Sequence, residues 1–169
     1  MQKFTLLLLL LTSCVWAQPS LELTPKGFEP VEVAIPALPN EKLIELTKSW
    51  AAEVNRKLKA KYDITEVTES GITITGYKKN AFLIRNKGET FDYAIGYSMK
   101  VSFSRNSYTL RFTVNAIYTN QDRLVQYKIP DYFNSAGELK EGYDQLKPTL
   151  EKTVNDLAVS HYNFIMNFR

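Results

Sequence analysis

Residues able to do acid–base or metal chemistry are scarce in this chain. Among its 169 residues there is one histidine, His161, and one cysteine, Cys14. Zinc sites, disulfide scaffolds and Cys/His catalysis each need several such side chains at set spacings, so the composition excludes them. His161 falls on the apolar side of a predicted C-terminal helix. We therefore expect it to pack or cap rather than to act as a base or a ligand.

The carboxylates show no catalytic pattern either. Glycosidase chemistry needs two acids that face each other across a cleft, and calcium loops need closely spaced acids such as Asp-x-Asp. The sequence also lacks a Gly-x-Ser-x-Gly elbow and a Gly-rich phosphate loop. We therefore predict no catalytic residue, no metal and no cofactor. The acids considered are Glu66 with Glu69, Asp131 with Glu138, and Asp122.

The overall composition is that of one ordinary globular domain. Hydrophobic residues make up 44% and charged residues 23%, which is close to average usage. A net charge of +3 is too small for a strongly basic nucleic-acid binder. The aromatic residues, 12% of the chain, would suit stacking on sugars or bases, but most fall on a strand face that helices should cover. We interpret them as core and expect no nucleic-acid partner.

The first 17 residues have the pattern of a secretory signal: a charge at Lys3, an apolar run over Leu6–Leu11 and the small residue Ala17. The run is shorter than the roughly 20 residues that span a bilayer. Two cleavage sites remain open. Cleavage after Ala17 predicts a periplasmic or secreted protein. Cleavage before Cys14, at the end of a stretch that resembles a lipobox (Leu11-Thr12-Ser13-Cys14), predicts a lipid anchor on the outer membrane.

The elements that must position any site form one predicted α+β domain over residues 29–169, after a linker or arm over 18–28. Alternating apolar residues predict strands over 31–35 and 72–75. Between them, helical spacing predicts an amphipathic helix over about 41–61 with Asn40 as its N-cap.

Two longer strands follow, and their apolar positions switch from odd to even. The odd set begins at Phe91 and ends at Phe103, and the even set runs from Tyr108 to Tyr118. A hairpin whose paired residue numbers add to 211 puts both sets on one face, with Phe103 opposite Tyr108. A slip of one residue would separate them.

The last predicted elements are a strand near 124–129, a loop over 130–142 and a helix that follows Pro148. Val125, Tyr127 and Ile129 are expected to point inward from that strand. The helix carries an apolar stripe that includes His161 and ends near Phe168. One apolar sheet face and two amphipathic helices predict a two-layer domain.

This order, β-α-β-β-β-β-α, resembles the TBP-like fold, named for the TATA-box-binding protein. The chain further resembles an uncharacterised family of exported Bacteroidetes proteins, a domain of unknown function with this fold. The resemblance covers about residues 28–168. It implies a curved antiparallel sheet with two helices on one face and brings no reaction with it. It rests on Phe28–Val33, the helix with Leu43 and Trp50, Ile72–Gly76, and Val101–Tyr108, where the turn lacks the glycine of the family pattern.

The sheet face away from the helices is the predicted contact surface. Its candidate residues are Lys100, Arg111, Asn115 and Lys128, and the cations would favour an acidic partner. We interpret the chain as a non-enzymatic binding or accessory module of the bacterial envelope. Its partner would be an envelope protein or another surface component, and the membrane would be contacted only through the lipid anchor. The alternative is a periplasmic or secreted hydrolase with a site in the 130–142 loop or on the exposed sheet face.

Overall fold

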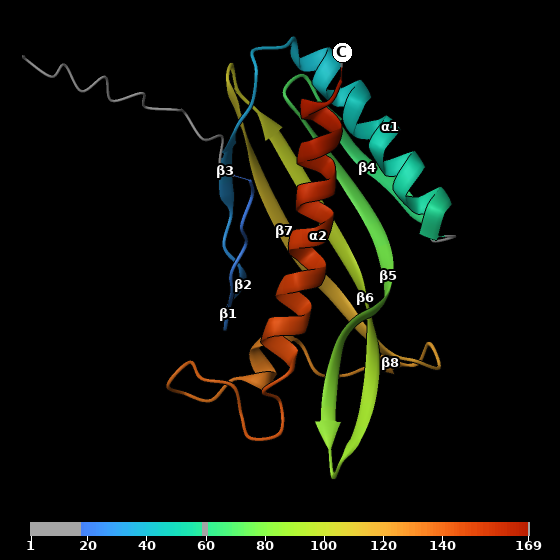
Figure 1. Cartoon of the computed structure of the whole chain (residues 1–169), viewed down its shortest axis with the longest axis vertical. Helices are drawn as coiled ribbons and strands as arrows, with labels where there is room; N and C mark the ends of the chain where they lie inside the picture. Colours follow the sequence, from blue (N-terminus) through green and yellow to red (C-terminus); the bar gives the residue numbers. More distant parts are fainter. Residues whose placement is uncertain (1–17, 59–60, 169) are drawn as a thin grey trace, which may run out of the picture.

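The computed structural model describes residues 18–58 and 61–168. The predicted signal segment, including Cys14, lies outside the described residues. A six-stranded antiparallel sheet runs in the order β3-β7-β6-β5-β4, with β8 also paired to β7. Its strands are β3 (Val31–Ala34), β4 (Tyr62–Thr68), β5 (Gly71–Asn86), β6 (Glu89–Phe103), β7 (Ser107–Thr119) and β8 (Leu124–Val125). Helices α1 (Asn40–Leu58) and α2 (Leu146–Met166) lie on the same face of this sheet (Figure 1).

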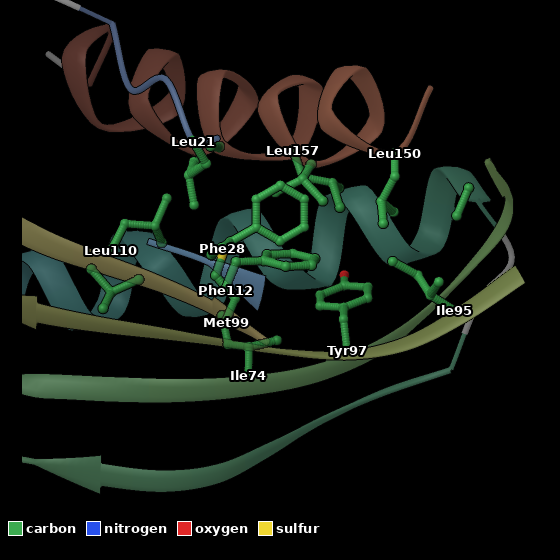
Figure 2. Close-up of a cluster of buried hydrophobic side chains, with 14 of the residues drawn as sticks. Leu21, Phe28, Ile74, Ile95, Tyr97, Met99, Leu110, Phe112, Leu150 and Leu157 are labelled. Carbon is green, nitrogen blue, oxygen red and sulfur yellow. The ribbon is translucent and has the colours of Figure 1, made fainter. Parts of the chain in front are cut away.

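The core lies between the sheet and α2. Figure 2 shows Leu150 and Leu157 of α2 above Tyr97, Met99 and Phe112 of the sheet, all of them buried. Tyr97 and Phe112 stack with their ring centroids 5.0 Å apart. Each of these large side chains removes apolar area from water, which is the main favourable contribution to folding.

The stretch over residues 18–28 forms an arm that packs on the core. It contains the short hairpin of β1 (Leu23–Thr24) and β2 (Gly27–Phe28), drawn in blue beside β3 (Figure 1). The amides of Leu21 and Leu23 donate to the side chains of Asn155 and Glu151 on α2, each at 2.7 Å. Leu21, Leu23 and Phe28 are buried, so the arm covers the part of the sheet that α2 leaves open.

The hairpin of β6 and β7 has the register predicted from the sequence, up to Val114. Phe103 pairs with Tyr108, Met99 with Phe112 and Tyr97 with Val114. Beyond that point a bulge leaves Asn115 without a partner, since Gly96 pairs with Ala116. The inward positions of β7 therefore change from even to odd, and Ile117 is buried where Ala116 and Tyr118 were expected to be.

Several other predictions need correction. The 124–129 strand is wrong beyond Val125: β8 is two residues long, Tyr127 is 58% exposed, and a 3-10 helix begins at Ile129. Phe91 is 41% exposed, because it lies in the part of the β5–β6 hairpin that extends past α2 (Figure 1). Strand β4 was missed, and the strand predicted over 72–75 extends to Asn86 in β5. The first predicted helix ends earlier, at Leu58, and the last one begins earlier, at Leu146, so that Pro148 lies in its first turn.

Candidate functional site

The predicted contact residues on β6 and β7 lie on the outer face of the sheet. Lys100 and Arg111 are paired across the two strands and exposed. Asn115, at the bulge, donates from Nδ2 to Ser98 Oγ at 2.6 Å. Lys100 differs from the other candidates because it has an acidic partner: its Nζ lies 3.0 Å from Glu66 Oε2. This bond lowers the pKa of Glu66, with a smaller effect from the Thr73 hydroxyl.

The outer edge of β7 is interrupted. Strand β3 pairs with residues 107–110 of β7, and β8 pairs with Ile117 and Tyr118. Between them, residues 111–116 pair only with β6 among the described strands. β3 and β8 thus occupy the two ends of one strand edge and leave a six-residue gap.

A groove of about 670 Å³ lies along this gap. Three segments line it: Lys26–Phe28 of the arm, Arg111–Tyr118 of β7 and Leu124–Pro130. Three of the four predicted contact residues, Arg111, Asn115 and Lys128, belong to this lining, whereas Lys100 does not. The groove therefore replaces the whole sheet face as the candidate site.

The groove is cationic. Its lining contains Lys26, Arg111 and Lys128 and no Asp or Glu. The ion pairs found within the part of the chain that the structure describes involve none of these three cations. Three positive side chains without internal counter-ions in a concave site favour an anionic ligand, because a cleft lined by one sign of charge concentrates the field.

The groove also offers apolar surface and backbone polar groups. Leu124 and Tyr127 in its lining are each 58% exposed. Asn106 C=O accepts from Ile35 N–H on the outer edge, while Ser107 C=O accepts from Ser104 N–H in the hairpin. Backbone groups alternate along an antiparallel strand, and the register is unbroken to Val114. The N–H and C=O of Val114 consequently point to the open edge.

The 130–142 loop uses its polar side chains to hold its own shape. Asp131 Oδ2 accepts from Lys128 N–H at 2.7 Å. Asn134 Oδ1 accepts from the amides of Ala136 and Glu138 at 2.9 and 3.0 Å, and Glu138 Oε2 accepts from Asn134 Nδ2 at 3.3 Å. Asp131 and Glu138 therefore both act within the loop, and by fixing Lys128 the loop supports one wall of the groove.

Asp122 and His161, two further candidate groups, have structural partners. Asp122 accepts a 2.5 Å hydrogen bond from the Tyr77 hydroxyl, and partial burial together with this carboxylate raises the pKa of Tyr77 to about 12. His161 is fully buried and contacts Thr47, Trp50 and Tyr108. Within residues 18–58 and 61–168, no group of three or more His, Cys, Asp or Glu side chains is placed to hold a metal ion. Neither described helix is long and apolar enough to cross a membrane.

Sequence reasoning missed Lys26, Leu124 and Tyr127. Lys26 lies in the turn of the β1–β2 hairpin, a segment with no clear periodicity. Leu124 and Tyr127 were placed in a longer strand, and Tyr127 was expected to point inward. Charge and alternation predicted that Arg111 and Lys128 would lie on the same surface. They did not predict the groove, because it forms only where β3 and β8 end along β7.

Two solved structures with a similar fold come from Bacteroidetes. A TBP-like protein from Parabacteroides distasonis ATCC 8503 matches with a TM-score of 0.55 and 15% identity, over 83% of this chain and 93% of that one. The fold is TBP-like. A DUF4468 family protein from Bacteroides ovatus ATCC 8483 matches with a TM-score of 0.56 and 12% identity, over 89% of each chain.

The TBP-like order is formed by β3, α1, β4, β5, β6, β7 and α2. The predicted resemblance to an uncharacterised TBP-like family is therefore confirmed at the level of fold. No family model and no curated protein matches the sequence. Since a fold does not by itself imply a function, the site has to carry the functional inference.

Proposed function

We propose that this protein is an exported, non-enzymatic binding module of the bacterial cell envelope and that the groove at the β7 edge is its contact site for an acidic partner. The cationic lining carries the proposal: Lys26, Arg111 and Lys128 come from three separate segments and share one hollow with no acid in it. The same lining provides the exposed side chains of Leu124 and Tyr127. Charge attracts and orients a partner, while apolar contact supplies affinity.

Export is part of this proposal. It rests on the signal-like pattern of residues 1–17, and the arm begins to pack immediately afterwards, at Leu21. In an exported protein, a groove with three cations and no acid in its lining could bind anionic components of the envelope. Lipid on Cys14 would instead hold the domain at the membrane.

The proposal can be tested by crosslinking in cells. A photo-crosslinking residue is placed at Gln126, an exposed position in the groove lining, and a second one at Thr109, which is exposed on the outer sheet face but outside the lining. Crosslinks at position 126 to an acidic envelope component are expected, and they should be fewer at position 109. The products are identified by mass spectrometry.

A charge series gives the decisive comparison. The variant Lys26→Glu/Arg111→Glu/Lys128→Glu should lose the crosslinks at position 126. Lys61→Glu should keep them, because Lys61 is exposed beside β4, at the other edge of the sheet, and lies outside the groove lining. The folded state of both variants is checked by circular dichroism. Undiminished crosslinks in the groove variant would show that these cations do not bind the partner.

A further inference from the structure

We propose that the partner enters the groove as an extended acidic segment of another protein, which pairs with β7 as an additional strand between β3 and β8. This inference rests on the proposed function and specifies its binding mode. Addition of a peptide strand to an open sheet edge is a common mode of peptide recognition: main-chain hydrogen bonds give affinity, and alternate side chains give specificity.

The length of the open edge fits a short peptide. Residues 111–116 of β7 span about 20 Å at 3.3 Å per residue, so a segment of roughly six residues fills the gap. The chain itself leaves the edge at both sides. Pro30, which has no N–H to donate, precedes β3, and β8 ends at Val125. An incoming strand would therefore complete an edge that β3 and β8 have already begun.

Unpaired backbone groups give such a strand a place to bind. The N–H and C=O of Val114 point to the open edge, and Val114 is half-buried. The backbone N–H and C=O of Phe112 point to the same edge. Phe112 is only 2% exposed, however, and its ring packs against Phe28 of the arm. Pairing is consequently centred on the stretch from Val114 to the bulge at Asn115. A backbone polar group that is partly removed from water gains from a partner on another backbone.

Charge selects the kind of protein segment. Lys26, Arg111 and Lys128 have no acidic neighbour in the lining. Pairing of two copies of this chain edge to edge would bring the two sets of cations together, which like-charge repulsion disfavours. A strand with acidic residues meets them favourably. Because successive side chains of a strand point to opposite faces, apolar residues between the acids can contact Leu124 and Tyr127. The expected partner sequence alternates acidic and apolar residues.

The test uses a synthetic probe and the purified, nitrogen-15-labelled protein as the cell produces it. The probe is a blocked six-residue peptide of alternating glutamate and valine. A second peptide has the same sequence with alternate amides N-methylated, so its charge is equal but its hydrogen-bonding edge is lost. Binding is followed by NMR, together with hydrogen exchange at the Val114 amide. We expect N-methylation to weaken binding on the order of tenfold or more, and the first peptide to slow exchange at Val114 by a similar factor.

The outcomes separate the two proposals. Equal binding of both peptides, with unchanged exchange at Val114, would overturn strand addition and leave the acid-binding groove intact. Failure of the peptide to bind at millimolar concentration while the groove crosslinks persist in cells would also overturn strand addition. Equal competition by single-stranded DNA or a sulfated polysaccharide of matched charge would show a general polyanion site and overturn the peptide assignment. Loss of peptide binding in Lys26→Glu/Arg111→Glu/Lys128→Glu, but not in Lys61→Glu, is expected if both proposals hold.

Discussion

His161 is buried and neutral, and its tautomer is set by the way in which Thr47 uses its one hydroxyl proton. Thr47 Oγ1 donates to Leu43 C=O at 2.8 Å and lies 3.0 Å from His161 Nε2. Its proton is already used, so it must accept from the imidazole, and Nε2 carries the ring hydrogen. Nδ1 is buried and has no hydrogen-bond partner among the described residues, and the rings of Trp50 and Tyr108 meet the imidazole edge to face. Burial lowers the pKa of His161 from 6.5 to about 3.

This predicts a loss of stability in mild acid. Above pH 6.5 the histidine is neutral in both states and has no effect on the pH dependence. Below it, the unfolded chain binds a proton that the folded protein excludes until about pH 3. The free energy of unfolding should therefore fall by about 2 kcal/mol from this group between pH 7 and pH 5.

Urea melts at the two pH values measure this term. His161→Gln keeps a donor toward Thr47 but cannot titrate, so it should be less stable than the wild type at pH 7, with a difference that shrinks by about 2 kcal/mol at pH 5. The carboxylates titrate in both proteins and cancel in the comparison. Parallel pH dependence of the two proteins would mean that His161 is protonated in the fold.

The role of His161 could be predicted from the sequence because its position on an apolar stripe is a local property. The lining of the candidate groove could be predicted only in part. Arg111, Asn115 and Lys128, which were predicted from alternation and charge, are in that lining. Lys26 was not predicted, because its approach to β7 depends on the β1–β2 hairpin, whose residues show no period. Lys100 shares the pattern of Arg111, and only the position of Glu66 on β4 removes it from the site.

At the scale of the elements, the sequence predicts strands well where apolar residues alternate regularly and poorly where they do not: β3 was predicted over its whole length, but β5 only up to Thr75. The β6–β7 register follows from two long apolar sets. The burial pattern of β4 explains why it was missed: six of its seven residues are exposed and only Ile64 is half-buried, so it carries no alternation. The bulge at Asn115 left no mark on the pattern, because Ala116, Ile117 and Tyr118 are all apolar and either parity satisfies it.

The pairing of β5 with β6 depends on a glycine. Gly76 lies opposite Tyr97, and a Cβ added at Gly76 would lie 2.6 Å from Tyr97 Cζ and Oη. The tyrosine ring is buried and stacks on Phe112, so it cannot easily move aside. We predict that Gly76→Ala lowers the free energy of unfolding by about 1–3 kcal/mol, as overpacking does.

A double-mutant cycle tests the cause. Tyr97→Leu removes the ring and costs stability by itself, but Gly76→Ala in that background should cost less than about 0.5 kcal/mol. Gly88→Ala does not serve as a control, because its positive φ of 82° adds strain. Full additivity of Gly76→Ala and Tyr97→Leu would mean that backbone entropy or β-propensity, and not the ring, sets the effect.

At the scale of the whole molecule, the arm belongs to the core. Leu23 is 1% exposed, and its amide binds Glu151 of α2. The neighbouring Glu22 is exposed and pairs with Lys147 at 2.9 Å. Leu23→Ala should lower the free energy of unfolding by about 2–5 kcal/mol, and Glu22→Ala by less than about 1 kcal/mol. Equal small losses in denaturant melts would mean that the arm detaches without weakening the fold.

The packed arm also bears on where an exported chain can be cut. The signal-like pattern ends at Ala17, four residues before Leu21, whose amide binds Asn155. Cleavage after Ala17 keeps every side chain with which the arm covers the core, and so does cleavage before Cys14. Cleavage a few residues further on would remove Leu21 and Leu23 and expose the apolar surface beneath them.

We predict that the protein recovered from the envelope or the medium begins at Gln18, and intact mass spectrometry measures this directly. A mass that begins at Cys14 with added acyl chains would show the lipid-anchored form. The mass of the uncut chain would contradict export itself and remove the envelope from the proposed function, although the groove and its charge would remain.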